Sequence, residues 1–230
     1  MSVLMELNNV SFYFDKGKHN ETKALDSISL KVPEGGFVGI VGTPGAGKST
    51  LLDILSGIIL PTEGEYLFKG ENMAKKSAAK RAKMRNAEFG FVLQDFGLLG
   101  ANTGLENVCL PLRFRRIAPR MIEKMGLEIM EKMNILHLKD RKVSELSGGE
   151  CQKIAIARAL VHKPSVLFAD EPTGGLDEIN TVLFIEQLAK INKEGVTIVI
   201  VTHDTKALRS CSSIYSLTDG RLEEVKQEGA

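Results

Sequence analysis

The chain has 230 residues, of which 43% are hydrophobic and 26% are charged. These proportions are ordinary for a globular protein, and the length suits one domain or two tightly joined subdomains. The formal net charge is +1, so the composition gives no argument for a nucleic-acid partner, and we expect none. No apolar run approaches the roughly 20 residues that a membrane helix needs.

The cysteines favour a reducing compartment, and the N-terminal residues argue against a signal peptide. Cys109, Cys151 and Cys211 are widely spaced and odd in number, which argues against a disulfide framework or a zinc site. The first residues include Glu6 and lack a basic stretch followed by an apolar one. We therefore expect no signal peptide.

The first hundred residues read mainly as short strands. Apolar runs predict strands at 4–7, 10–14, 28–32, 37–41 and 65–68, with turn sequences at 33–36 and 61–64. A basic helix is expected over 75–85, where six basic residues and no acidic one occur. An apolar strand-like run then covers 89–93 and ends at Gln94.

The second half alternates between helices and strands. Residues from about 105 to 161 are predicted to be mostly helical, and strand signals return at 166–169 and 196–201 with a helix at 179–191 between them. This alternation predicts an α/β fold, with a mainly parallel sheet covered by helices on both faces and interrupted by a helical insert. Ligands of such sheets bind beyond the carboxyl ends of the strands.

A phosphate-binding loop follows the predicted strand at 37–41. The stretch fits the pattern G-x-x-x-x-G-K-[ST] with the residues Gly42, Thr43, Pro44, Gly45, Ala46, Gly47, Lys48, Ser49 and Thr50. Glycines let the backbone N–H groups turn toward an anion, and the following helix adds its positive N-terminal end. Lys48 is expected to reach the β- and γ-phosphates of a nucleotide, and the Ser49 hydroxyl to bind Mg²⁺.

Two adjacent carboxylates end the predicted strand at 166–169. Asp170 suits Mg²⁺, because this ion keeps several of its waters and uses one or two carboxylates. Glu171 is then expected to face the attacking water as general base or to position it. Taken without the phosphate-binding loop, the same residues are equally compatible with a strand that ends in an acidic turn.

The stretch 146–160 carries a resemblance to a family. Ser147 and Gly149 lie in what reads as a glycine turn without a cap, followed by an amphipathic helix whose N-terminal end favours anions. This stretch resembles the signature motif of ABC-type ATPases. The resemblance covers nearly the whole chain, with a Walker A loop at 42–50, a Q-loop at Gln94, the signature at 146–150, Walker B at 166–171, a D-loop at 175–177 and a switch histidine at His203.

The resemblance implies a P-loop NTPase core with a mainly parallel sheet, an N-terminal antiparallel β subdomain and an α-helical signature subdomain. Residues 1–230 would form a single ABC ATPase domain. The core would comprise 1–94 and 162–222, the helical subdomain about 95–161, and a polar tail 223–230.

The resemblance also implies Mg²⁺-dependent ATP hydrolysis by two cassettes, identical or homologous, that face each other head to tail. ATP on one Walker A loop would be closed over by Ser147 and Gly149 of the other cassette. Gln94 would contact Mg²⁺ and the attacking water, His203 would contact the γ-phosphate, and Asp177 would act across the dimer.

An aromatic residue near the N-terminus is expected to stack on adenine. Phe14 occupies the expected position and Tyr13 is its neighbour. Because alternation places Val10, Phe12 and Phe14 on one face of a strand, an ordinary core role for this stripe is the alternative.

The runs 89–99 and 105–112 resemble one branch of the family, the ATPases of macrolide-exporter, lipoprotein-release and cell-division type. This branch implies a peripheral cassette on the cytoplasmic face of the cell membrane, driving a separate transmembrane permease. Phe96, Leu98 and Leu99 would then dock a coupling helix or, alternatively, pack in the core. The basic segment 75–85 is either attracted to an anionic leaflet or a solvated helix face. A soluble ABC ATPase of the repair, translation or iron–sulfur assembly type is the alternative function.

Overall fold

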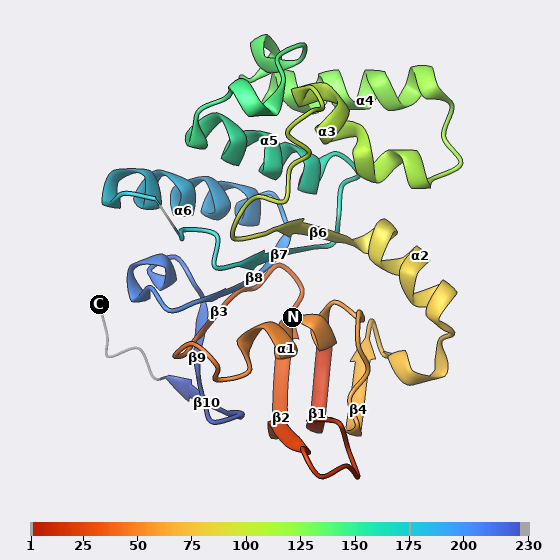
Figure 1. The fold of residues 1–230 in the computed structure, drawn as a ribbon, viewed down its shortest axis with the longest axis vertical. Coiled ribbons are helices and arrows are strands. Elements are labelled where there is room, and N and C mark those ends of the chain that lie inside the picture. Colours follow the sequence, from red (N-terminus) through yellow and green to blue (C-terminus); the bar gives the residue numbers. More distant parts are fainter. Residues whose placement is uncertain (1, 175, 226–230) are drawn as a thin grey trace.

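The computed structural model describes residues 2–174 and 176–225. It contains two sheets, whose arrangement is shown in Figure 1. An antiparallel sheet has the order β2-β1-β4-β5 and is formed by β1 (Val3–Phe14), β2 (Thr22–Pro33), β4 (Glu63–Phe68) and β5 (Glu71–Asn72). A central sheet has the order β10-β9-β3-β8-β7-β6 and is formed by β3 (Phe37–Val41), β6 (Phe89–Val92), β7 (Val166–Asp170), β8 (Thr197–Thr202), β9 (Ser213–Thr218) and β10 (Arg221–Val225).

The central sheet is parallel from β9 to β6, and β10 pairs with β9 in the antiparallel sense. The α-helices are α1 (Lys48–Leu55), α2 (Ala78–Glu88), α3 (Gly104–Cys109), α4 (Pro119–Lys132), α5 (Gly148–Leu160) and α6 (Glu178–Lys193). Short 3₁₀ turns include η1 (Met73–Lys75), η2 (Leu110–Phe114), η3 (Leu136–Leu138), η4 (Val143–Glu145) and η5 (Thr205–Leu208). The predicted α/β class, with a parallel-dominated sheet and an antiparallel N-terminal sheet, is confirmed.

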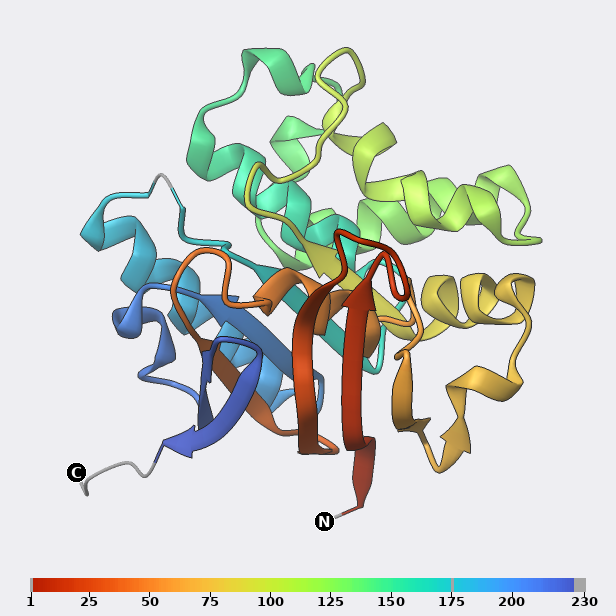
Figure 2. The same cartoon turned by 60° about the horizontal axis from the view of Figure 1, so that its bottom comes forward.

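The central strands are buried on both faces, which explains their continuous apolar sequences. In β8, Val199 and Val201 point into a core shared with α1 and the antiparallel sheet, whereas Ile198 and Ile200 point into a second core with α6. Figure 2 brings the antiparallel sheet to the front of the central one. Because side chains alternate between the two faces of a strand, the central sheet packs against α1 and the antiparallel sheet on one face and against α6 on the other.

The helices α3, α4 and α5 gather at one end of the molecule, away from the antiparallel sheet (Figure 1). They enclose a third core, which includes Val108, Met130 and Ile154. This end of the chain therefore packs around its own apolar interior. Within the described residues, no helix combines the length and the apolar character needed to cross a bilayer.

Several element boundaries differ from the sequence-based predictions. The runs at 4–7 and 10–14 are one strand, β1, which passes through Asn9 at φ 49 and changes register there. Helix α2 begins only after Ser77, because the Ser77 side chain accepts a hydrogen bond from the backbone N–H of Lys80. Helix α4 ends at Lys132, so the region predicted as mostly helical from about 105 to 161 is divided into α3, α4 and α5 with 3₁₀ turns between them.

The C-terminal strands were not predicted, and the expected polar tail at 223–230 was wrong in its first residues. Residues 223–225 belong to β10, which pairs with β9 and packs Leu222 against the core shared with the antiparallel sheet. Hydrogen bonding to β9 and this single apolar contact hold a strand whose exposed side chains are polar. Residues 226–230 lie outside the described residues.

Candidate active site

The loop after β3 is shaped by glycines. Gly45 and Gly47 have φ angles of 83° and 102°, in the left-handed region that favours glycine. A Cβ on Gly47 would lie 2.7 Å from the Ala24 carbonyl oxygen, and one on Gly42 would lie 2.4 Å from the Leu217 carbonyl oxygen. The loop therefore has this path only with glycine at these positions.

Lys48 lies within this loop, at the start of α1, with 8% of its surface exposed. Its Nζ donates to the carbonyl oxygens of Gly42 at 2.8 Å and Thr43 at 3.1 Å. It also lies 3.3 Å from Glu171 Oε1. An ammonium group has three protons, so these three oxygens match its donors and hold its charge at the mouth of the loop.

Glu171 follows β7 and links Lys48 to His203. Its Oε2 accepts a hydrogen bond from the His203 backbone N–H at 3.1 Å and lies 2.9 Å from His203 Nδ1. Its φ of 43° is uncommon for a residue with a side chain and stores strain of about 1–3 kcal/mol. The backbone N–H of Glu171 is bonded to the Val201 carbonyl at 2.8 Å, which holds this geometry.

Burial and hydrogen bonding oppose each other at the Glu171 carboxyl. Burial raises its pKa, but the hydrogen bonds from His203 and Lys48 together outweigh burial and hold the pKa below its ordinary value. Glu171 is therefore ionised at neutral pH, the state that a general base requires.

Asp170 has the opposite balance. Burial raises its pKa, the negative charges of Glu171 and Asp53 raise it further, and Lys48 opposes them only in part. A divalent cation beside Asp170 would relieve this repulsion. The hydroxyl of Ser49 is exposed in the first turn of α1, so both residue types expected for Mg²⁺ are present.

Within the described residues, no cluster of three or more acidic, histidine or cysteine side chains is placed to hold a metal. Magnesium commonly uses one or two carboxylates together with substrate phosphates and water. The donor set of Ser49 and Asp170 fits an ion that arrives with a nucleotide better than a permanently bound one.

Gln94 is exposed just beyond the carboxyl end of β6. A Cβ on Gly174 would lie 3.4 Å from Gln94 Cγ and 3.6 Å from Nε2, so the Gln94 side chain lies against the loop that follows Glu171. The ends of β3, β6, β7 and β8 thus bring Lys48, Gln94, Asp170, Glu171 and His203 to one edge of the central sheet, as the sequence predicted.

The side chains of the stripe Val10, Phe12 and Phe14 become more exposed toward the end of β1. Val10 is fully buried, Phe12 is partly buried, and Phe14 is 50% exposed with its ring 5.0 Å from that of Phe12. The Tyr13 ring instead lies beneath the amines of Lys16 and Lys23, at 4.9 and 5.5 Å. Phe14 is thus the more accessible ring for stacking.

The expectation of an uncapped turn before α5 was wrong. Ser147 caps this helix, because its Oγ accepts from the Glu150 N–H at 3.4 Å while Glu150 Oε2 accepts from the Ser147 N–H at 2.8 Å. This reciprocal pair is a capping box. A Cβ on Gly148 or Gly149 would meet nothing within 4 Å, so this helix end faces open space.

Asp177 is also a helix cap. Its two carboxylate oxygens accept from the backbone N–H and the side-chain amide of Asn180, both at 2.8 Å. Gly175, which precedes it in the predicted D-loop, lies outside the described residues. Within residues 2–174 and 176–225, Ser147, Gly149 and Asp177 make no hydrogen bond or ion pair with Lys48, Glu171 or His203.

The sequence analysis missed the role of Arg158. This residue of α5 is only 8% exposed, and its guanidinium donates to the carbonyl oxygens of Gly97 at 2.6 Å and Phe96 at 2.5 Å. Phe96 and Gly97 have φ angles of 61° and 53°, so Arg158 holds a tight bend just after Gln94. A charge within the apolar run 154–160 was the available signal.

Comparisons with known proteins agree with this geometry. A family model described as ABC transporter matches residues 25–174. The dimeric structure of MJ0796, described as a bacterial ABC transporter cassette, is 36% identical with a TM-score of 0.86, covering 98% of this chain and 100% of that one. The same values hold for a dimeric post-hydrolysis state of MJ0796 bound to ADP and Pi.

A third structure is CbiO1 from Clostridium perfringens, described as part of the ABC transporter complex cbiONQ. It is 30% identical with a TM-score of 0.86, covering 97% of this chain and 88% of that one. The family model spans more than half of the chain and these likenesses span nearly all of it. The chain belongs to the ABC transporter family, as an ATP-binding and ATP-hydrolysing cassette.

Proposed function

We propose that this cassette is the ATP-driven motor subunit of a membrane complex. Two cassettes close head to tail on ATP, hydrolysis separates them, and the motion drives a separate transmembrane subunit. One observation carries the proposal: the Lys48–Glu171–His203 cluster reaches the surface through the exposed His203, and the capped helix end at Ser147 faces open space on another part of the chain. A second cassette brings such a helix end to the bound phosphates.

The residues then act as follows. The loop 42–50 binds the phosphates, and Lys48 exchanges its contact with Glu171 for the β- and γ-phosphate oxygens. The freed Glu171 carboxylate accepts a proton from the attacking water, and Gln94 orients that water. His203, already in contact with Glu171, turns toward the γ-phosphate.

Other contacts complete the site. Phe14 stacks on the adenine, while Ser147 and Gly149 of the second cassette close over the γ-phosphate. Asp177, at the start of α6, acts across the dimer. When bound through Ser49, Gln94 and Asp170, Mg²⁺ neutralises charge that develops on the phosphate oxygens.

A groove for the transmembrane subunit lies between α2, β6, η2 and α5. It has a volume of about 1200 Å³, and its walls include the exposed apolar side chains of Ile58, Leu93 and Phe114. Of the other lining residues, Leu93 directly precedes Gln94 in sequence and Gly97 follows it by three residues. We therefore expect that movement of the transmembrane subunit in the groove shifts the bend that Arg158 holds, and with it Gln94.

This groove differs in its residues from the docking surface expected from the sequence. Phe96, Leu98 and Leu99 do not line it. Leu98 packs against the core of α3, α4 and α5, so the core alternative is correct for this residue. Of the residues in the bend, Gly97 lines the groove and Phe96 does not.

We place the cassette in the macrolide-exporter, lipoprotein-release and cell-division branch, peripheral on the cytoplasmic face of the membrane. The branch rests on the resemblance at 89–99 and 105–112 alone. Relatives described as dimeric or as part of a transporter complex support a second cassette and a membrane partner. A soluble ABC ATPase is the second candidate, and the partner distinguishes the two.

The test is an affinity pull-down of the Glu171→Gln variant from detergent-solubilised native membranes in Mg-ATP, with Lys48→Ala as the control that cannot hold ATP. We expect a polytopic protein to be recovered with Glu171→Gln in excess over Lys48→Ala. Recovery of soluble partners only, with the cassette absent from washed membranes, would contradict a membrane motor.

A further inference from the structure

The groove described above has the wrong charge for a purely apolar or basic occupant. Resting on the proposed function, we propose that it receives an acidic segment of the transmembrane subunit, with an apolar face on Phe114, Leu93 and Ile58 and carboxylates toward the basic rim. The charge of the lining and its exposed apolar side chains carry this inference.

Every charged side chain that lines the groove is basic. Among the described residues the lining contains Lys83, Arg85, Arg115, Arg116 and Arg158, and it contains no aspartate or glutamate. The net charge of the whole chain is only +1, so this local excess is not a general property of the molecule. Such a surface favours an anionic partner and opposes a cationic one.

The inner arginines are bound to neutral oxygens, so their charge is not cancelled. Arg85 Nη1 donates to the Gly57 carbonyl at 2.8 Å, and Arg115 Nε donates to the Asn86 side-chain oxygen at 2.9 Å. Glu88 acts on Arg115 from a distance, but its carboxylate is bonded to Lys69 at 2.7 Å and to the hydroxyl of Ser165.

Lys83 and Arg116 are exposed at the rim of the groove. In the described part of the chain, no hydrogen bond or ion pair is recorded for either side chain. They are therefore available to carboxylates that arrive with a partner. Ion pairs at such a rim set orientation and discriminate between partners more than they add affinity.

The groove also exposes large apolar side chains beside these charges. Phe114 is 78% exposed, Ile58 50% and Leu93 39%. An apolar patch rimmed by charge is typical of a site that another polypeptide covers. An amphipathic segment presents both features on one side, with apolar and acidic residues at helical spacing.

His162 also lines the groove and is neutral. It is 7% exposed, its Nε2 lies 3.0 Å from the Phe89 carbonyl oxygen, and its Nδ1 has no partner. Burial, with a contribution from Arg115, lowers the pKa of His162 to about 4. The neutral ring donates through Nε2 to the carbonyl and adds no charge to the groove, so lysine and arginine alone give the lining its charge.

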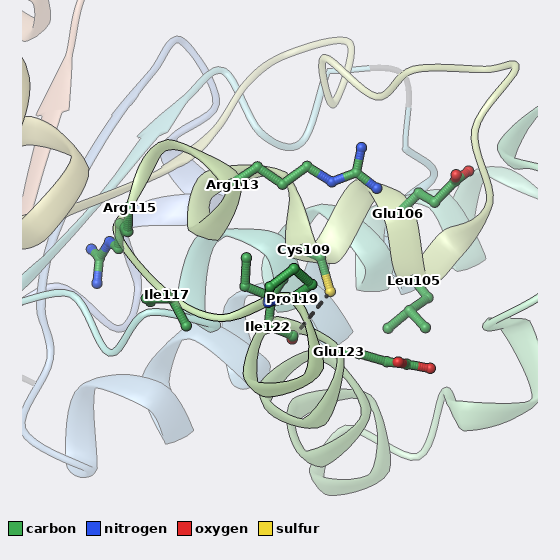
Figure 3. A pocket seen from close by; sticks show the side chains of 9 residues that line it. All are labelled: Leu105, Glu106, Cys109, Arg113, Arg115, Ile117, Pro119, Ile122 and Glu123. Atoms are coloured by element: carbon green, nitrogen blue, oxygen red, sulfur yellow. Dashed lines mark hydrogen bonds between the residues drawn. The ribbon is translucent and has the colours of Figure 1, made fainter.

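A second, smaller pocket is a useful contrast. It has a volume of about 540 Å³ and includes Arg113, Arg115, Glu106 and Glu123 in its walls. Figure 3 shows Arg113 extending toward the side where Glu106 lies, above the apolar residues around Pro119. Because both signs of charge are present, this pocket does not select the sign of an occupant, whereas the larger groove does.

The first experiment reverses the rim charges in the Glu171→Gln background and repeats the membrane pull-down in Mg-ATP. Lys83→Glu with Arg116→Glu is compared with Lys75→Glu with Lys80→Glu, which makes the same charge change at two lysines outside the groove. Thermal melting checks that both fold. We expect recovery of the polytopic protein to fall about tenfold for the groove pair and to stay at the parental level for the control pair.

The second experiment maps the contact. A benzophenone amino acid in place of Phe114 and carbodiimide coupling at the Lys83 amine should link the same segment of the polytopic protein, and that segment should contain aspartate or glutamate. A linked segment without carboxylates, or equal recovery with the groove and control pairs, overturns the inference and leaves the proposed function standing.

Two other results have distinct meanings. The groove pair is also compared with the parental variant for binding to protein-free vesicles that contain phosphatidylglycerol. A loss of vesicle binding equal to the loss of the polytopic protein assigns the basic rim to lipid headgroups and overturns the inference. If the parental Glu171→Gln variant recovers no polytopic protein, the proposed function itself fails.

Discussion

Arg158 connects α5, the helix that Ser147 caps, to the bend after Gln94. We predict that Arg158→Met lowers both the stability of the cassette and its rate of ATP hydrolysis. Methionine keeps most of the length and the apolar packing of the side chain but removes the two hydrogen bonds to the carbonyl oxygens of Phe96 and Gly97. The bend, in which both residues have positive φ, then loses its anchor.

The size of the effect follows from these contacts. A hydrogen bond from a charged group contributes about 1.5–3 kcal/mol. Gly97 is exposed, so water replaces part of the lost bonding, and removal of a buried guanidinium regains part of its desolvation cost. We expect a net loss of about 2–3 kcal/mol. For a chain of this length that lowers Tm by roughly 5–10 °C, and misplacement of Gln94 lowers kcat about tenfold, or about 1.4 kcal/mol.

The assays are thermal melting without nucleotide and steady-state release of phosphate. The Tm and kcat of Arg158→Lys should lie between those of Arg158→Met and those of the parent, because an ammonium lacks the planar fork that donates to two carbonyls. Arg120→Met is the matched control, since Arg120 is exposed on α4. Parental kcat and Tm in Arg158→Met would refute the reasoning that this arginine positions the Gln94 bend.

Three further predictions concern the cluster around Lys48. Glu171→Gln should bind ATP in calorimetry yet lower kcat by about 10²–10⁴; parental turnover would remove Glu171 from the role of base. Lys48→Ala should lose ATP binding and ATP-driven dimerisation together, and tight Mg-ATP binding would contradict that role. Because burial and neighbouring carboxylates raise the pKa of Asp170, its ionisation destabilises the fold at neutral pH. Asp170→Asn should therefore raise Tm without nucleotide, with a gain that disappears below the ordinary aspartate pKa, while activity is lost; an unchanged or lower Tm at pH 7 would contradict this.

The cluster of phosphate-binding and acidic residues could be predicted because each of its parts is local in sequence. The loop 42–50 follows an apolar strand and begins a helix, and Asp170 and Glu171 follow another apolar strand. Parallel strands place their carboxyl ends at one edge of a sheet, so the joint location follows from the strand count and order. The direct contact between Glu171 and His203, across 32 residues, was not predicted, because it depends on the pairing of β7 with β8.

The capping of α5 was available in the sequence and was misread. Ser147 and Glu150 have the spacing of a capping box, and the structure has this box in full. The two adjacent glycines between them led instead to the prediction of a glycine turn without a cap. A serine three residues before a glutamate is the stronger local signal at a helix start.

The Arg158 contact and the groove depend on packing between distant segments. Arg158 meets Gly97 across 61 residues, and the groove combines Ile58, Phe114 and His162 from separate elements. Likewise, β9 carries mostly half-buried polar residues with Leu217 as its buried one, so no periodic pattern marks it. Such features arise only after the elements are assembled.

The central claim is that each ATP site is shared by two cassettes, and a mixing experiment tests it most directly. Lys48→Ala cassettes lack the phosphate-binding lysine, and Ser147→Arg cassettes lack the serine that closes over the phosphates, so each variant should be inactive by itself. In a dimer of one with the other, both defects fall in the same site and the second site is intact. We predict that an equal mixture regains activity, up to about a quarter of the parental turnover when half of the dimers are mixed and each has one working site. A mixture as inactive as its two components, or one with full parental turnover, would contradict a shared site.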